Sequence, residues 1–164
     1  MKKLKFSEVE APEVVRLDFG PGPVSWSAQL VINRRPGTVD EIHANYVLQY
    51  MPSVERKDFV NAAYRALKPG GTLVVIVPAW TAHKAYQDCD VVWPPVVEGW
   101  FQVLGKAWRE AQPIKQVGYT CDFDFTLGYG MHPAIMSRNS EYQHHALTFW
   151  KEAAQDIHVT LTKR

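Results

Sequence analysis

The hydrophobic and polar residues between positions 39 and 78 predict a strand, a helix, a tight turn and a second strand. Within this unit the strand covers residues 39–46, and Ser53 is a suitable N-cap for a helix over residues 54–67. One face of this helix is apolar at spacings of three and four residues, which is typical of a helix packed on a sheet. These apolar positions are Phe59, Ala62, Ala63, Ala66 and Leu67.

Pro69-Gly70-Gly71 ends the predicted helix, because glycine readily adopts the positive φ found just past a helix end. The run of apolar and β-branched residues over 72–77 is expected of a central parallel strand covered on both faces. Strand, helix and strand in this order form the crossover that a parallel sheet requires. We therefore expect an α/β fold.

Shorter elements are predicted on both sides of this unit. Residues 14–19 form a first strand, and residues 24–34 fit a helix and a strand equally well. The later elements are a short helix over 81–88, helices over 96–110 and 139–154, and strands over 119–127 and 156–163. Both late strands alternate apolar and polar residues, so they predict a half-exposed antiparallel edge on the parallel sheet.

The composition fits one globular domain over residues 1–164, with 46% hydrophobic and 21% charged residues. A net charge of +1 gives no electrostatic attraction for nucleic acid or an anionic membrane. The N-terminus has no apolar run of a signal peptide, and the longest apolar run, residues 73–77, cannot span a bilayer. We expect a cytoplasmic protein that does not enter membranes. Its two cysteines, Cys89 and Cys121, show no disulfide framework or metal-ligand spacing, and we expect no metal site.

The segment AYRALKPGGTLVVIVP is similar to the helix, turn and fifth strand of class I S-adenosylmethionine (SAM) dependent methyltransferases. Residues 39–77 correspond to the fourth strand, helix and fifth strand of that family, and the two late strands to its closing pair. The chain also resembles small methyltransferase-like proteins of the phage-encoded and glycan-associated kind. That similarity covers residues 39–164 and rests on VDEIH, WPP, DFDF, RN and the final DIHVTLTKR.

The resemblance implies a truncated Rossmann-like methyltransferase sheet, mostly parallel, with an antiparallel C-terminal strand pair. Only about twenty residues separate Asp18 from Asp40, whereas each crossover alone takes a dozen or more. At least one strand–helix unit of the family is therefore missing. Residues 14–19 correspond either to strand one or to strand three. We favour strand three, because similar proteins have a comparable strand shortly before their VDEI segment.

The resemblance also implies SAM as the cofactor. In this family a glycine-rich turn after strand one lets the backbone approach SAM, and an acidic residue that ends strand two binds the ribose, as in dinucleotide folds. Here the turn is eroded, because its third glycine position holds proline or valine, and an ordinary Pro-Gly turn is the alternative. The cofactor-binding candidates are Asp18, Gly20, Gly22, Asn45 and Tyr46. The last two end the fourth strand, where a cap of the strand end is the alternative.

Tyr86, Asp88 and Trp93 follow the fifth strand and are the candidate substrate-binding residues, with packing as the alternative. Asp122 and Asp124 share one strand face and suit either acid–base chemistry or a solvated face. No catalytic residue is assigned. Near the fourth strand, tyrosine and glutamine stand where the family has ionisable groups. Methyl transfer depends mainly on the positioning of donor and acceptor, so this replacement does not exclude it.

Three functions stay open, and with them whether the chain is an enzyme. It transfers methyl groups from SAM to a small molecule or sugar, or it is an inactive methyltransferase-like scaffold used for binding or assembly, or it is half of a split enzyme. Missing strands would expose a sheet edge, and exposed edges invite pairing. We therefore expect a homo-oligomer or a companion chain to cover that edge.

Overall fold

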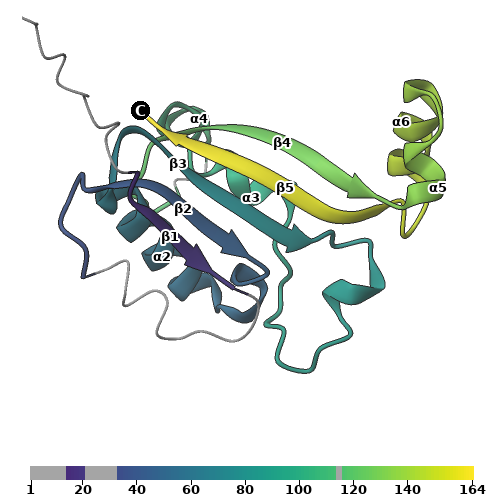
Figure 1. Cartoon of the computed structure of the whole chain (residues 1–164), viewed down its shortest axis with the longest axis horizontal. Coiled ribbons are helices and arrows are strands. Elements are labelled where there is room, and N and C mark those ends of the chain that lie inside the picture. Colours follow the sequence, from purple (N-terminus) through teal and green to yellow (C-terminus); the bar gives the residue numbers. More distant parts are fainter. Residues whose placement is uncertain (1–13, 21–32, 114–115) are drawn as a thin grey trace, which may run out of the picture.

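The computed structural model describes residues 14–20, 33–113 and 116–164. They form one five-stranded sheet of order β1-β2-β3-β5-β4 (Figure 1). The strands are β1 (Arg16–Phe19), β2 (Val39–Asn45), β3 (Leu67–Pro78), β4 (Phe123–Met131) and β5 (Ala154–Lys163). β1, β2 and β3 pair in parallel, whereas β5 is antiparallel to both β3 and β4. The predicted fold class, a Rossmann-like sheet with an antiparallel C-terminal pair, is confirmed.

The predicted crossover between residues 39 and 78 is present. β2 and β3 are direct neighbours, with Ile42 opposite Leu73 and Ala44 opposite Val75. Helix α2 (Ser53–Ala66) connects them. Pro52 occupies the N-cap position and Ser53 is already helical, so the predicted serine cap is wrong.

Strand β1 lies beside β2, with Leu17 opposite Ile42. In the doubly wound order 3-2-1-4-5, the neighbour of strand four is strand one. β1 therefore occupies the place of strand one, and the assignment to strand three is wrong. Within the described residues β1 is an edge strand, because no further described strand pairs with its other side.

The region predicted as one helix over 96–110 forms two short helices, α3 (Glu98–Gln102) and α4 (Lys106–Ala111). The backbone at Gly105 is extended, with φ −87° and ψ 127°. The carbonyl of Leu104 accepts a hydrogen bond from the N–H of Phe123 at 3.1 Å, so this segment binds the start of β4. A tertiary contact therefore interrupts the apolar helical pattern.

The other helices are shorter than predicted. Residues 81–88 contain only the 3-10 helix η2 (His83–Ala85), and a second 3-10 helix, η1 (Leu48–Tyr50), follows β2. Between β4 and β5 lie α5 (Pro133–Met136) and α6 (Ser140–Phe149), which project beyond the end of the sheet in Figure 1. Asn139 caps α6, because its side chain accepts a hydrogen bond from the N–H of Tyr142 at 2.9 Å.

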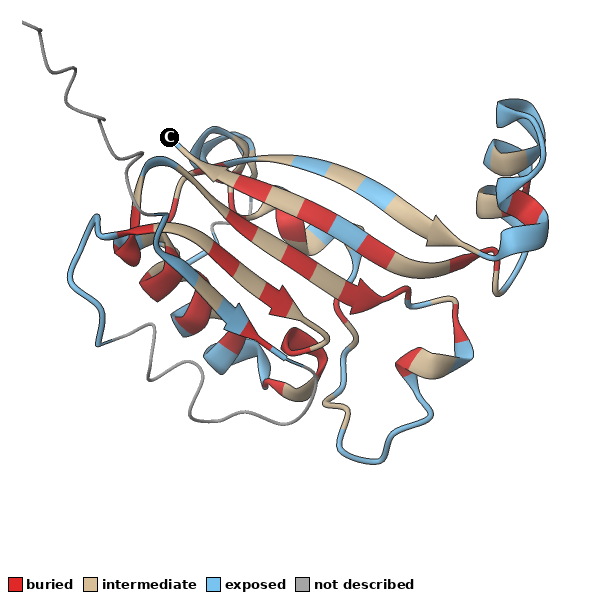
Figure 2. Ribbon diagram, viewed as in Figure 1, coloured by how far each residue is buried: buried red, intermediate tan, exposed pale blue. Residues whose placement is uncertain are grey.

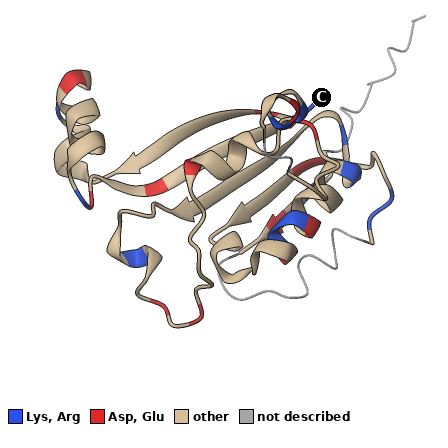
Figure 3. Cartoon of the chain, turned by 180° about the vertical axis from the view of Figure 1, so that it is seen from behind, with Lys and Arg blue, Asp and Glu red and all other residues tan. Residues whose placement is uncertain are grey.

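The described helices cover one face of the sheet. α2, α3 and α4 lie behind the strands in Figure 1 and in front of them in Figure 3. On this side Leu73, Val75 and Val77 of β3 are fully buried, whereas Val74 and Ile76 on the opposite face are only partly buried (Figure 2). The expectation that β3 is covered on both faces is therefore wrong for the part of the chain that the structure describes.

None of the described helices is long and apolar enough to cross a membrane. Basic and acidic residues are interspersed along the described chain in Figure 3. Cys89 is exposed and Cys121 is buried, and both are free thiols.

Candidate functional site

The carboxyl ends of β1, β2 and β3 meet at one edge of the sheet, where open α/β sheets bind their ligands. Phe19 pairs with Ala44, so Gly20 and Asn45 follow at neighbouring positions in the register. Three segments continue the chain from this edge: η1 after β2, and η2 and the loop over residues 86–97 after β3. Four of the predicted cofactor residues lie along or just beyond these strand ends, and Gly22 lies outside the described residues.

Asn45 ends β2 with an unsatisfied polar atom. Its side-chain oxygen Oδ1 is buried and accepts no hydrogen bond from the described chain. A buried polar atom without a partner costs about 1–3 kcal/mol, so such atoms in native proteins are commonly explained by a water, an ion or a ligand. Asn45 thus offers an acceptor at the position where the resemblance places a cofactor.

The backbone turns sharply directly after Asn45. Tyr46 has φ 56°, which is unusual for a residue other than glycine. Its N–H donates to the carbonyl of Ile76 at 2.7 Å, which fastens this turn to the end of β3. Strained backbone of this kind is concentrated at binding and active sites.

A polar cluster of Tyr46, Lys84 and Asp156 joins the ends of β2 and β3 to the start of β5. Lys84 Nζ lies 2.6 Å from Asp156 Oδ1 and 5.4 Å from the centre of the Tyr46 ring. Burial, and then the hydrogen bond and charge of Asp156, raise the pKa of Tyr46 to about 12. The phenol therefore stays protonated at neutral pH and donates to Asp156 instead of acting as a base.

Sequence reasoning missed Lys84 and Asp156. They meet because β5 pairs antiparallel with β3, which places Asp156 opposite Pro78. That register is a long-range property, and the residues between Pro78 and Lys84 show no periodic signal for it. The only indication in the sequence is that Asp156 opens the DIHVTLTKR segment of the resemblance.

Asp18 and Gly20 show no feature that a cofactor would require. The Asp18 side chain is 59% exposed and accepts a hydrogen bond from Arg16 Nε at 2.9 Å. A Cβ at Gly20 would meet no atom within 4 Å, so this position is open and does not need glycine for space. The acidic residue that ends strand two in the methyltransferase family has no counterpart among the described residues. The fit to SAM therefore rests on Asn45 and the open strand ends.

The three predicted substrate residues do come together. Tyr86, Asp88 and Trp93 line a small cavity of about 120 Å³, and the ring centres of Tyr86 and Trp93 are 6.2 Å apart. The N–H of Asp90 and the hydroxyl of Tyr50 both donate to the Asp88 carboxylate, at 3.0 and 2.8 Å, and lower its pKa. Asp88 is therefore an ionised acceptor that holds its own loop.

This loop is anchored by Arg56, which the sequence analysis missed. Its guanidinium is buried and donates to the carbonyls of Leu48 at 2.8 Å, Pro94 at 2.8 Å and Val92 at 3.1 Å. Burial lowers the pKa of Arg56. Because all three acceptors are main-chain atoms, no pattern of acidic side chains could have indicated this role.

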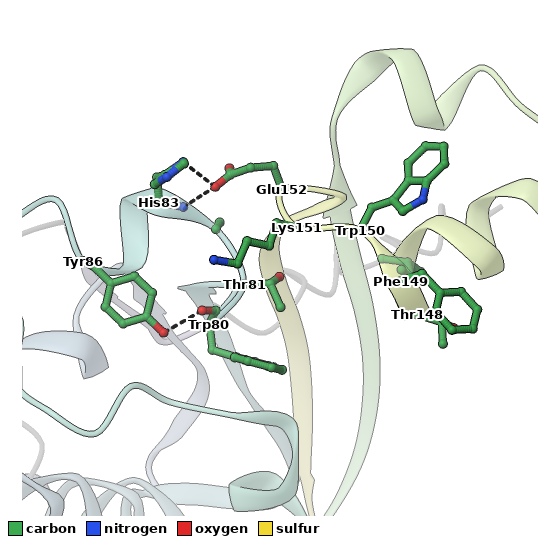
Figure 4. Close-up of a pocket in the computed structure, with 11 residues that line it drawn as sticks. Trp80, Thr81, His83, Tyr86, Thr148, Phe149, Trp150, Lys151 and Glu152 are labelled. Atoms are coloured by element: carbon green, nitrogen blue, oxygen red, sulfur yellow. Dashed lines mark hydrogen bonds and ion pairs between the residues drawn. The ribbon is translucent and has the colours of Figure 1, made fainter.

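A second cleft, of about 430 Å³, lies between the segment that follows β3 and the connection from α6 to β5. Figure 4 shows His83 paired with Glu152, with Phe149 and Trp150 at the other side. The distance from His83 Nδ1 to Glu152 Oε1 is 2.7 Å, and the His83 N–H donates to the same oxygen. The other carboxylate oxygen, Oε2, accepts a hydrogen bond from Gln155 Nε2 at 3.2 Å, so both oxygens are engaged within the protein.

Asp122 and Asp124 lie at the opposite edge of the sheet, because β4 begins there. Both carboxylates face Arg164, which forms an ion pair with Asp124 and lies 3.9 Å from Asp122. Asp122 also accepts the N–H of Lys106 at 2.8 Å. Their role is therefore to fasten β4, α4 and β5 together, and the acid–base alternative finds no support.

Asp88, Cys89 and Asp90 place their potential ligand atoms within 4.8 Å of one another, and all three residues are exposed. The Asp88 carboxylate is already bound by Tyr50 and by the N–H of Asp90. We assign no metal ion to this loop.

No protein-family model and no curated protein sequence matches the chain. Among solved structures it is similar to a SAM-dependent methyltransferase from Archaeoglobus fulgidus, with a TM-score of 0.58 and 11% identity. The match covers 84% of this chain and 65% of that one, so the chain spans about two thirds of its relative's length. A SAM-dependent methyltransferase from Thermotoga maritima matches at 13% identity and a TM-score of 0.47, over 94% of this chain and 84% of that one.

The first of these matches shows the fold, and the strand order of the sheet agrees with it. The chain has the methyltransferase-like fold of SAM-dependent enzymes, as the resemblance in its sequence indicated.

Proposed function

We propose that the chain is a SAM-dependent methyltransferase-like protein that holds SAM at the carboxyl edge of β1 and β2 and methylates a small molecule. The observation behind this proposal is the buried, unpaired Oδ1 of Asn45 at the end of β2. In a doubly wound sheet this position is the switch point between strands one and four, where a nucleoside ligand binds. Tyr46 continues the same edge, whereas contacts of Asp18, Gly20 and Gly22 with the cofactor stay predictions that rest on the sequence resemblance alone.

SAM, when bound, supplies a methyl group on a sulfonium that a nucleophile displaces directly. The residues of this chain have the tasks of binding and alignment, which suits a site without a group poised to take protons at neutral pH. Asn45 would accept a hydrogen bond from the cofactor. Tyr86, Asp88 and Trp93 would bind the acceptor, beside the cluster of Tyr46, Lys84 and Asp156.

Calorimetry with SAM and with S-adenosylhomocysteine tests the proposal. We expect micromolar binding by the isolated chain and a loss of at least tenfold, about 1.4 kcal/mol, in Asn45→Leu. Asn139→Ala is the matched control, because Asn139 caps α6 and lies away from the strand ends. Failure of the wild-type chain to bind either compound would contradict the proposal.

A second candidate is a scaffold for binding or assembly, or half of a split enzyme. Two observations favour it: β1 is an edge strand within the described sheet, and Val74 and Ile76 are only partly buried on the face without described helices. A second copy or a companion chain would cover these surfaces. A stable oligomer by light scattering without SAM binding would support the scaffold, and SAM binding only with a companion chain would support the split enzyme.

A further inference from the structure

A larger cavity lies beside the predicted substrate residues, and we name it the aromatic cleft. Its lining includes Trp80, Tyr86, Trp93, Trp100 and Tyr119, together with the prolines at 94 and 95. Its volume is about 500 Å³, within the range of cavities that bind small molecules. Trp80 follows the end of β3, so the cleft opens at the same edge of the sheet as Asn45.

The aromatic rings of the cleft are unusually accessible. Trp80 is 47% exposed, Tyr86 50% and Trp93 75%. Large apolar side chains that are exposed together, instead of singly, are typical of binding sites. Each ring offers a flat face on which a second planar group can stack.

The cleft is held in shape by hydrogen bonds. The hydroxyl of Tyr86 donates to the carbonyl of Trp80 at 2.7 Å, and Trp100 Nε1 donates to the hydroxyl of Tyr119 at 3.1 Å. Arg56 fixes the wall formed by Pro94 through the 2.8 Å hydrogen bond to its carbonyl. These contacts hold Tyr86, Trp100, Tyr119 and the Pro94 wall in place before any ligand arrives, which lowers the entropic cost of binding.

The charges of the cleft restrict the class of ligand. Among the described lining residues Arg56 is the only charged side chain, and three of its five N–H groups already donate to carbonyls. Arg56 is only 4% exposed, so it presents little surface to an anion, and its positive charge disfavours a quaternary ammonium ion. The nearby Asp88 does not line the cleft, and its carboxylate is engaged by Tyr50.

The polar groups restrict the class further. The hydroxyl of Tyr86 already donates to Trp80 and that of Tyr119 already accepts from Trp100, so these two and Ser53 supply few hydrogen bonds to orient a ligand. A sugar would bury several hydroxyl groups that lack partners here, which is costly. An uncharged planar ring with one or two polar substituents suits the lining.

We propose that the aromatic cleft binds a small uncharged molecule with a planar aromatic ring, stacked on Trp93 and Trp80. This deepens the proposed function, because such a molecule would be the methyl acceptor, contacted by Tyr86 and Trp93 while Asp88 holds the loop that carries them. That role rests on the proposed function, whereas the binding itself requires no SAM.

The test uses N-phenyl-1-naphthylamine, an uncharged aromatic probe that becomes fluorescent in apolar sites, added to the full chain without SAM. We expect saturable binding that 1-naphthol displaces and that choline, glucose and a proline-rich peptide do not. Trp93→Ala should weaken binding at least tenfold, and Trp93→Phe by less than threefold, because it retains a ring. Trp150→Ala is the control, since Trp150 is 43% exposed, similar to Trp80, but lies outside the cleft.

Three results would overturn the inference: no saturable binding, displacement by choline, glucose or the peptide, or equal losses in Trp93→Ala and Trp150→Ala. Circular dichroism confirms that each variant is folded. Calorimetry with SAM on Trp93→Ala separates this inference from the proposed function. Aromatic binding without SAM binding would refute only the proposed function, and SAM binding without aromatic binding would refute only the inference.

Discussion

The two ends of the parallel strands differ in how completely their polar groups are satisfied. At the amino ends, Lys68 binds Asp40 at 2.8 Å and Lys163 Nζ donates to the carbonyl of Leu67 at 2.7 Å. Arg164 joins the same edge through its ion pair with Asp124. At the carboxyl ends, Asn45 Oδ1 has no partner and Tyr46 has a left-handed backbone.

This difference separates a structural edge from a candidate binding edge. Polar groups at the amino ends hold one another, so they have little left to offer a ligand. The carboxyl ends combine an unsatisfied acceptor, local strain and accessible aromatic rings, which are features that stability alone does not favour. Four experiments, ordered by the size of the expected effect, test whether the two edges really differ in this way.

Removal of the Arg56 guanidinium should have the largest effect. Arg56→Met removes the side-chain donor of the Leu48, Val92 and Pro94 carbonyls, of which that of Leu48 still accepts the N–H of Met51. We expect a loss of about 3–5 kcal/mol in the free energy of unfolding, measured by urea denaturation. Arg16→Met, which removes an exposed ion pair with Asp18, should change it by less than about 1 kcal/mol. Similar losses in both variants would show that the loop is not anchored in this way.

Gly71→Ala tests the close packing of the amino edge. A Cβ at Gly71 would lie 2.9 Å from the carbonyl oxygen of Asp40, which is main chain and cannot move easily. We expect a loss of about 1–3 kcal/mol in urea denaturation. Gly99→Ala is the matched control, because Gly99 lies in α3 with open space around its Cβ position, and alanine there should stabilise by about 0.5–1 kcal/mol.

Asn45→Leu should raise stability while it lowers SAM binding. The substitution replaces a buried oxygen without a partner by an apolar group, so the ligand-free chain should gain about 1 kcal/mol. Thermal unfolding without ligand measures the gain, and calorimetry measures the loss of binding. A destabilised variant would indicate that Asn45 has a structural partner and would remove the main contrast between the edges.

The pH dependence of stability reports on Tyr46. Its pKa is about 12 in the folded chain, above the ordinary value of 10. The stabilisation is therefore fully present below pH 10 and is lost between pH 10 and about pH 12, because the unfolded chain ionises first. Tyr46→Phe should remove this part of the alkaline loss in urea titrations, whereas Tyr142→Phe on α6 should leave it unchanged. Parallel curves for wild type and Tyr46→Phe would contradict the assignment.

The parts of the fold that could be predicted are those set by neighbouring residues. The crossover from β2 through α2 to β3 follows from local periodicity and is present. The Pro-Gly-Gly segment that was predicted to end the helix lies within β3 instead, because α2 ends at Ala66 and the backbone is already extended at Leu67. The place of β1 beside β2 depends on register between distant segments. The break at Gly105 likewise arises from a contact between Leu104 and Phe123 that no local pattern contains.

The candidate site follows the same rule. Tyr86, Asp88 and Trp93 lie on one loop, so their proximity could be predicted from the sequence. Lys84 and Asp156 could not, because the pairing of β5 with β3 brings them together. The apolar run of β3 also gave no indication that Val74 and Ile76 would be only partly buried, since such runs are typical of strands covered on both faces.

The insertion of β5 between β3 and β4 has a consequence for biosynthesis. A ribosome releases β4 before β5, yet β5 is the strand with which β4 pairs in the described sheet. Residues 123–131 therefore stay unpaired until residues 154–163 have been made and have left the ribosome. A chain truncated before residue 154 and released from the ribosome should be far more accessible to proteases over residues 123–131 than a chain that includes residues 154–163.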